Sequence, residues 1–183
     1  QVMVTYWYAD RALTDFVDAI REAYPDSLVF VTGDHSSNPI PFQAGIIDRT
    51  EITLREQFCT SFAMWHQELD QRIFAGNTIG SHMNILPTIF ELIAPQDFQY
   101  YSLFSSLMEP IDHVVTPYHW LDTEAVGGAA DGRFQGLAAT SAPVAIEFDP
   151  TGQARYKSEI DGYTTVTGWI ARHPELLRNY PEH

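Results

Sequence analysis

Hydrophobic residues near the start of the chain recur at the spacing of an amphipathic helix. Apolar residues fall at helical offsets at Tyr6, Ala9, Leu13, Phe16, Val17 and Ile20, and charged residues occupy the other side of the same helix. Pro25-Asp26-Ser27 combines residues that end helices and form turns. The pattern therefore predicts a helix that ends near Tyr24.

A short run of consecutive apolar residues follows this helix. Leu28 to Thr32 is rich in β-branched side chains and does not alternate with polar residues. A strand without alternation is typical of a parallel sheet that helices cover on both faces. We therefore expect a buried central strand that ends at Gly33-Asp34-His35, and ligands of open α/β sheets bind at that edge.

The next hundred residues alternate between loop-forming and apolar segments. Residues 36–50 contain turn formers and two prolines, which predicts a long loop. Phe62 to Trp65 reads as a second buried strand, and Asn77 to His82 as a polar loop. A helix is expected over Pro87 to Ile93, since proline suits the first turn of a helix and Pro95 ends it.

After about residue 110 the pattern is typical of a small antiparallel α+β region. Asp149-Pro150-Thr151-Gly152 has the composition of a β-turn, so the segments on either side of it predict a hairpin. The expected elements are a strand over 113–120, a flexible turn over 126–132, two strands over 142–148 and 153–160, and a closing helix over about 164–179. We therefore expect an α/β core over residues 1–110 and a small antiparallel sheet with a closing helix over residues 111–183.

The charge balance limits the classes of ligand. The chain has 183 residues, with 10 Lys and Arg against 24 Asp and Glu, which gives a net charge of −14. Such an acidic chain repels phosphate backbones, so we do not expect binding of nucleic acid through a basic face. An anionic substrate would need a local positive centre, such as a metal ion.

Two further features concern the limits of the chain. Its single cysteine, Cys59, excludes an intrachain disulfide and a cysteine-rich zinc module. No stretch reaches the ~18 consecutive apolar residues of a membrane-spanning helix. Because the sequence begins with Gln1 and runs at once into an apolar segment, we expect it to be a piece of a longer protein.

Asp34 and His35 are the first candidates for chemistry, because they follow a predicted buried strand directly. Together they offer one carboxylate oxygen and one imidazole nitrogen, a donor set that suits zinc or manganese. The alternative is that Asp34 caps a turn and His35 is an ordinary surface residue.

Four short motifs occur in an order that resembles a known superfamily. They are Tyr8-Ala9-Asp10-Arg11, Gly33-Asp34-His35, Ser81-His82 and Pro87-Thr88. Over residues 6–95 the chain resembles the sulfatase-like branch of the alkaline phosphatase superfamily, especially the lipoteichoic acid synthase and phosphoglycerol transferase group. The resemblance implies an α/β fold in which this chain forms the second half of an alkaline-phosphatase-like sandwich.

The resemblance also implies roles for particular residues. Asp34 and His35 match two of the family's metal ligands, for a divalent ion that could be Mn, Zn, Mg or Ca. His82 matches the family's Ser-His segment, where an imidazole can donate to nonbridging oxygens or protonate the leaving group. The alternative for His82 is a structural histidine at a helix start. Two positions depart from the family pattern, with Ser36 in place of a glycine and Asn84 in place of an aspartate.

The activity that the resemblance implies is hydrolysis or transfer at a phosphate or sulfate ester, carried by a small or lipid-linked substrate. The family's nucleophile and first acidic metal ligand lie upstream of Asp34, where nothing in this sequence matches them. The chain is therefore expected to be the carboxyl-terminal part of an extracytoplasmic enzyme, periplasmic or at the cell surface, whose parent protein is anchored in the cytoplasmic membrane. The alternative is a noncatalytic binding or scaffold domain that retains the fold.

The remaining candidates carry weaker signals. His66 follows the second predicted strand and could line the same sheet edge, and Arg49 could contact an anion from the long loop. Solvation at the surface is the alternative for both. His113 and His119 lie among aromatic residues, which favours packing over chemistry. Nothing in the sequence around Cys59 supplies the base that a nucleophile needs.

Overall fold

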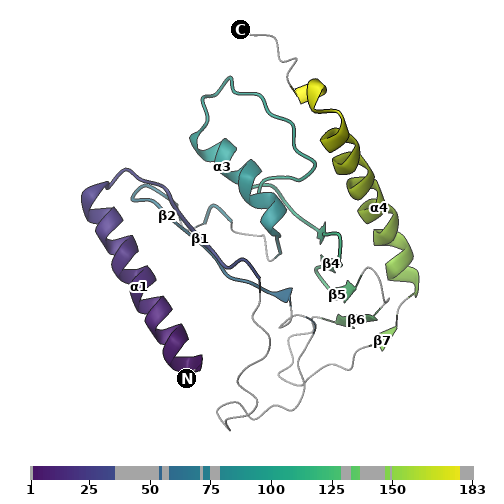
Figure 1. Cartoon of the computed structure of the whole chain (residues 1–183), viewed down its shortest axis with the longest axis horizontal. Coiled ribbons are helices and arrows are strands. Elements are labelled where there is room, and N and C mark those ends of the chain that lie inside the picture. Colours follow the sequence, from purple (N-terminus) through teal and green to yellow (C-terminus); the bar gives the residue numbers. More distant parts are fainter. Residues whose placement is uncertain are drawn as a thin grey trace. The chain divides into compact units, whose positions relative to one another are not determined.

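The computed structural model describes residues 2–35, 54, 58–70, 72–74, 79–128, 133–136, 147–148 and 150–177. These residues combine three helices with two small antiparallel sheets, which confirms a mixed α and β protein (Figure 1). The chain divides into two compact units, Gln1–Ile73 and Phe74–His183. The expected division between residues 1–110 and 111–183 stays a prediction.

The first unit contains one helix and one pair of strands. Helix α1, Val2–Ala23, forms where the apolar periodicity predicts it. Strands β1, Val29–Thr32, and β2, Phe62–Trp65, also form as predicted. They pair antiparallel, with Val29 opposite Trp65 and Thr32 opposite Phe62.

The prediction that β1 is a buried strand of a parallel sheet is wrong for the described residues. The sheet has two strands, Thr32 is exposed, and the other residues of β1 are only half-buried. Strand β2 is likewise half-buried rather than buried. An apolar run specifies a strand because β-branched side chains fit a pleated surface, but it does not specify the direction of the neighbouring strand.

Helix α1 joins the strands through its carboxyl-terminal end. The Arg21 guanidinium lies over the Trp65 ring, 4.6 Å from its centroid. Just beyond the helix, Gln67 Nε2 donates to Asp26 Oδ1 at 2.6 Å. Several large apolar side chains of α1 remain exposed, including Trp7 and Phe16. The contacts with β2 therefore fix one end of the helix.

The second unit opens with a short 3-10 helix and an α-helix. Residues His82–Asn84 form η2, and Ile85–Ile93 form α3. The predicted helix is confirmed and begins two residues earlier than expected. Pro87 lies at the third position of α3, where a missing N–H costs nothing because the first-turn amides have no partner within the helix.

Five strands form an antiparallel sheet in which each strand pairs with the next. They are β3, His113–Val115; β4, His119–Asp122; β5, Ala125–Gly128; β6, Arg133–Gly136; and β7, Glu147–Phe148. The expected single strand over 113–120 is therefore a hairpin of two strands. The expected flexible turn at 126–132 begins instead with strand β5, and residues 129–132 lie outside the described residues.

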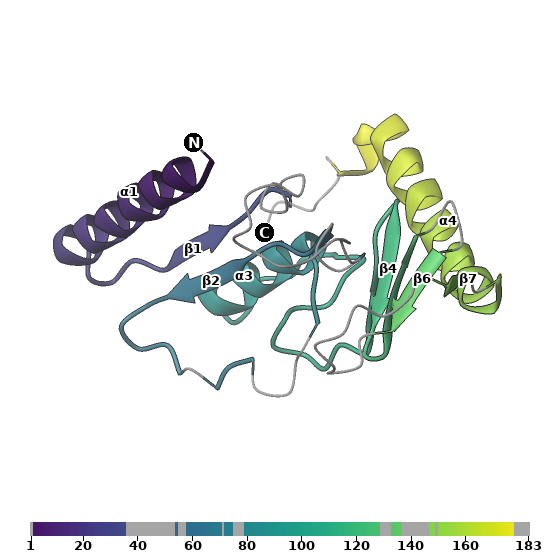
Figure 2. The same cartoon turned by 90° about the horizontal axis from the view of Figure 1, so that it is seen from below.

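Helix α4, Pro150–Arg172, lies against this sheet, and η3, Pro174–Leu177, follows it (Figure 2). The expected strand over 153–160 and the β-turn before it are wrong, because this segment is helical. Tyr156, Ile160 and Tyr163 recur at helical spacing, and Pro150 suits the first position of a helix. Tyr156 and Ile160 pack on Val115 and Trp120 to form the core of the unit.

Candidate functional site

Asp34 and His35 lie directly after β1 and point their polar atoms at each other. The His35 backbone N–H donates to Asp34 Oδ1 at 2.9 Å. The other carboxylate oxygen, Oδ2, lies 3.4 Å from His35 Nε2. Both side chains are largely exposed, at 87% for Asp34 and 76% for His35. The turn-capping alternative for Asp34 is thus realised through one oxygen, while the second oxygen faces the imidazole.

The spacing of this pair suits two ligands of one cation. Zinc binds carboxylate oxygen and imidazole nitrogen at about 2.0–2.2 Å, and a tetrahedral angle then separates the two ligand atoms by about 3.4 Å. The observed separation of Oδ2 and Nε2 is 3.4 Å. A strong charged hydrogen bond would bring the two atoms to about 2.7–2.9 Å. The donor types and their spacing therefore fit a divalent metal.

The residues before β2 hold the turn that presents this pair. Ser61 O accepts hydrogen bonds from Gly33 N at 3.0 Å and from Thr32 Oγ1 at 3.2 Å. A Cβ atom at residue 33 would overlap the Thr60 hydroxyl, so the close approach of Thr60 requires glycine there. Thr60 and Ser61 could not be predicted as part of this turn, because their signal in the sequence is only two hydroxyl residues at the start of a strand.

His66 does not lie beside Asp34 and His35. Antiparallel pairing places the carboxyl end of β2, where His66 follows, beside the start of β1. Four strand residues, or roughly 13 Å at 3.3 Å each, separate the two ends of the sheet. The expectation that His66 lines the same edge is therefore wrong, since it assumed parallel strands. The Nδ1 atom of His66 instead accepts a hydrogen bond from Glu68 N at 3.1 Å.

Two other candidates in this part of the sequence have different outcomes. Arg49 and the predicted loop over 36–50 lie outside the described residues, so the role of Arg49 in substrate binding stays a prediction. Cys59 is exposed and carries a free thiol.

His82 begins η2, and its neighbours form a reciprocal cap. Ser81 Oγ accepts from Met83 N, while Asn84 Oδ1 accepts from Ser81 N at 2.8 Å and from Ser81 Oγ at 2.9 Å. His82 itself is exposed. Asn84 therefore caps η2 together with Ser81, and the His82 side chain lies at the surface.

A buried polar network anchors this segment to the chain that follows α3. Asn84 Nδ2 donates to Ser105 O at 2.9 Å, and Thr88 Oγ1 donates to Asn84 O at 2.6 Å. Leu107 N donates to Thr88 Oγ1 at 2.8 Å. Asn84, Thr88 and Ser106 are almost completely buried. These contacts fix the backbone that carries His82, and sequence reasoning missed them because their partners lie about 20 residues away.

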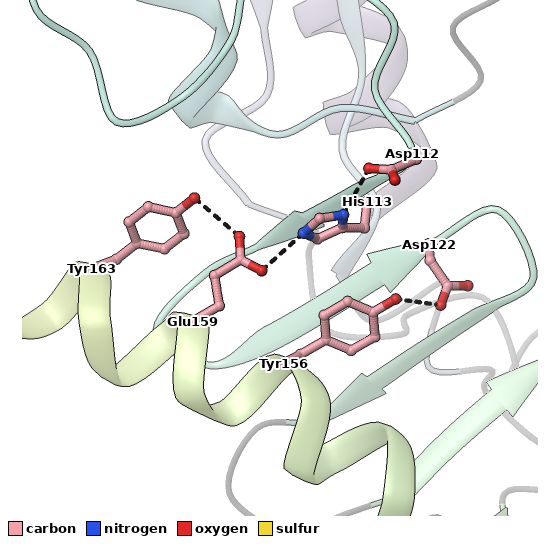
Figure 3. A network of polar contacts seen from close by, with 6 residues as sticks. All are labelled: Asp112, His113, Asp122, Tyr156, Glu159 and Tyr163. Atoms are coloured by element: carbon pink, nitrogen blue, oxygen red, sulfur yellow. Dashed lines mark hydrogen bonds and ion pairs between the residues drawn. The ribbon is translucent and has the colours of Figure 1, made fainter.

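A second polar network, also missed, connects β3 to α4 (Figure 3). His113 Nδ1 lies 2.7 Å from Asp112 Oδ1, and His113 Nε2 lies 2.8 Å from Glu159 Oε2. Tyr163 Oη donates to Glu159 Oε1 at 2.9 Å, and Tyr156 Oη donates to an oxygen of a second carboxylate, Asp122, at 2.8 Å. The aromatic packing expected for His113 is present, with its ring centroid 5.3 Å from that of Tyr156. Each ring nitrogen also contacts a carboxylate oxygen.

The ionisation of the two tyrosines follows from this setting. Burial, with the hydrogen bond and charge of Asp122, raises the pKa of Tyr156 to about 12. Burial, with the hydrogen bond and charge of Glu159, likewise raises the pKa of Tyr163 to about 12. Both phenols therefore remain neutral hydrogen-bond donors at ordinary pH. The network links α4 to the sheet, and both ring nitrogens of His113 are engaged by carboxylate oxygens.

The candidate residues fall into both units of the chain. Asp34 and His35 belong to the first unit, while His82 belongs to the second, so their proximity stays a prediction. Within the described ranges, no three or more His, Cys, Asp or Glu side chains gather as a metal site. The role of Asp34 and His35 as metal ligands stays a prediction. In the same ranges, no helix is long and apolar enough to span a bilayer.

Comparisons of the chain with models of protein families, with curated proteins and with solved structures found no match.

Proposed function

We propose that this chain supplies Asp34 and His35 to the divalent-metal site of a sulfatase-like enzyme. The enzyme resembles the lipoteichoic acid synthase and phosphoglycerol transferase group, and it transfers or hydrolyses phosphate or sulfate esters. One observation carries the proposal: a carboxylate oxygen of the exposed Asp34 side chain and an imidazole nitrogen of the exposed His35 side chain lie 3.4 Å apart after β1. That separation suits two ligands of one tetrahedral ion.

The metal is Mn, Zn, Mg or Ca. When bound, it neutralises the charge on the ester oxygens and lowers the pKa of the attacking nucleophile. Asp34 contributes negative charge and His35 a neutral nitrogen, and the Ser61 carbonyl fixes the backbone turn between β1 and this pair. The remaining ligands and the nucleophile belong to the upstream part of the parent enzyme, whose α/β sandwich this chain completes.

His82 is proposed to act on the substrate as a proton donor. The Ser81–Asn84 cap and the buried contacts of Asn84 hold its backbone, while its side chain is exposed. An imidazole can donate to a nonbridging oxygen or protonate a leaving group near neutral pH. The substrate is a small or lipid-linked ester outside the cytoplasm, in keeping with the family's extracytoplasmic location and membrane-anchored parents.

The test uses the parent protein, assayed on an aryl phosphate and an aryl sulfate with each divalent metal in turn. Asp34→Asn is expected to abolish turnover while the thermal unfolding curve stays unchanged. His82→Gln is expected to lower kcat about 100-fold or more, the usual contribution of a positioned acid or base. The matched control is Asp15→Asn, which removes an exposed carboxylate of the same unit that pairs with Arg11.

The results separate the two classes of function considered for the chain. Turnover that depends on metal and on Asp34 supports the enzyme. A folded parent that turns over neither ester with any of the metals supports the noncatalytic binding or scaffold domain instead. Full activity of Asp34→Asn, with unchanged metal content, would contradict the ligand assignment even in an active enzyme.

A further inference from the structure

The His113 ring contacts two carboxylates, and only its protonated form can donate a hydrogen bond to both of them. Its two ring nitrogens lie 2.7 Å from an oxygen of Asp112 and 2.8 Å from an oxygen of Glu159. Ionised carboxylates can only accept hydrogen bonds, so each ring nitrogen must carry a hydrogen and donate a hydrogen bond. A neutral imidazole has one N–H, whereas the imidazolium has two. Both short contacts can therefore be hydrogen bonds at the same time only when His113 is protonated.

The groups that face His113 come from three directions. Helix α4 contributes Glu159 and the Tyr156 ring, and behind Glu159 the Tyr163 hydroxyl donates to the second carboxylate oxygen. The residue before β3 is Asp112, and β4 places Asp122 opposite His113 in the strand register. Among the described residues, a positive group on this part of α4 is Arg155, whose guanidinium lies 4.9 Å from the centroid of the Tyr156 ring. The surroundings of His113 are thus mainly acidic.

These charges decide the direction in which the pKa of His113 moves. Burial lowers the pKa, but the hydrogen bonds and charges of Glu159 and Asp112 outweigh burial and raise it above 6.5. A raised pKa in the folded chain gives stability that is fully present below the unfolded value near 6.5. That stability is lost as the pH rises through the folded value.

We propose that protonated His113 forms a pH-dependent link between β3 and α4. The link is strong in mildly acidic conditions and weaker in alkaline conditions. Loss of its proton leaves one ring nitrogen with a lone pair that faces a carboxylate oxygen. Asp112 is 86% exposed and can turn to water, but the Glu159 side chain is only 33% exposed and is held by Tyr163. Glu159 therefore keeps at most an uncharged donor, and α4 is held less firmly at its middle.

The hydrophobic contacts set the extent of the change. Tyr156 and Ile160 remain packed on Val115 and Trp120 when His113 is neutral. We therefore expect α4 to open more often rather than to detach. This pH-dependent link goes beyond the proposed ester chemistry, since it depends on contacts of the second unit alone.

Hydrogen–deuterium exchange of the full chain tests the proposal, with rates compared at pH 6.0 and 8.5 after correction for the intrinsic pH dependence of exchange. Opening of the α4 amides should increase about tenfold for each unit by which the pKa of His113 exceeds 6.5. In His113→Gln this increase should vanish. The control His173→Gln changes a histidine near the end of α4 that contacts the Trp169 carbonyl, and it should behave as the wild type.

A nuclear magnetic resonance titration keeps the proposal testable if His113→Gln fails to fold. His113 should titrate above 6.5 in the wild type, and Glu159→Gln should lower that pKa and reduce the pH dependence of α4 exchange. A His113 pKa at or below 6.5 would overturn the proposal. An α4 pH dependence that persists undiminished in folded His113→Gln, or in Glu159→Gln, would also overturn it.

Discussion

Replacement of Asn84 by aspartate should keep the hydrogen bonds that its side chain accepts and remove the one that it donates. The Oδ1 atom accepts two hydrogen bonds from Ser81, which a carboxylate would keep. The Nδ2 atom donates to Ser105 O at 2.9 Å, which an ionised carboxylate cannot do. Asn84→Asp would therefore place an oxygen against a carbonyl oxygen at a residue that is only 2% exposed.

The expected loss in the free energy of unfolding follows from these contacts. A buried acceptor that loses its donor costs about 1–3 kcal/mol. A negative charge at the start of a helix stabilises the fold by about 0.3–1 kcal/mol. The net prediction for Asn84→Asp is a loss of about 1–2 kcal/mol near pH 7.5.

The pH dependence provides a sharper signature. A protonated carboxyl can donate its O–H to Ser105 O, so the folded chain favours the neutral form and raises the pKa of the introduced carboxyl. The deficit should be absent below about pH 4, the unfolded value for aspartate, and should grow as the pH rises. Urea denaturation at pH 4.0 and 7.5 measures it against Gln96→Glu, which adds the same charge at an exposed position. Equal stability of the two variants at pH 7.5 would refute the assignment of the Asn84 amide.

Two glycines give further predictions from the space around them. Gly127→Ala places a methyl group in the Trp120 indole and should cost about 1–3 kcal/mol of unfolding free energy, whereas Gly136→Ala, with its nearest atom 3.9 Å away, should lose less in thermal melting. Gly33→Ala overlaps the Thr60 hydroxyl and should speed amide exchange in β1 and β2, and a second change, Thr60→Ala, should restore protection. Unaltered melting of Gly127→Ala, or no rescue by Thr60→Ala, would contradict these contacts.

Local patterns predicted the elements but not their pairing. The apolar run at Leu28 to Thr32 specified a strand, and the structure has one at β1. Its direction relative to β2 depends on the path of the intervening chain, which no residue within the run encodes. The same limit explains His66, since its place at the far end of the sheet follows from antiparallel pairing alone.

The errors after residue 110 have a different cause. Asp149-Pro150-Thr151-Gly152 suits a β-turn, but Asp followed by Pro also suits the start of a helix. The spacing of Tyr156, Ile160 and Tyr163 identifies the helix only when it is read across the turn signal. Gly127 looked like part of a flexible segment, whereas it lies in a strand because the Trp120 ring covers it.

The two polar networks could not be predicted from local sequence. His113 and Glu159 are 46 positions apart, and the fold of the sheet under α4 brings them together. Asn84 was noticed only as a departure from a family pattern, while its function depends on Ser105, 21 positions later. Asp34 and His35 could be predicted as a candidate pair because residues adjacent in sequence need no tertiary information to be recognised together.

Manganese-induced broadening of the histidine ring resonances tests the central claim most directly, because it detects weak binding and reports where the ion lies. With substoichiometric Mn²⁺ added to the full chain, the His35 resonances should broaden before those of His82, His113 and His173. Asp34→Asn should reduce the effect, and Asp15→Asn should leave it unchanged. Broadening spread evenly over the acidic surface, or undiminished at His35 in Asp34→Asn, would contradict the assignment of Asp34 and His35 as metal ligands.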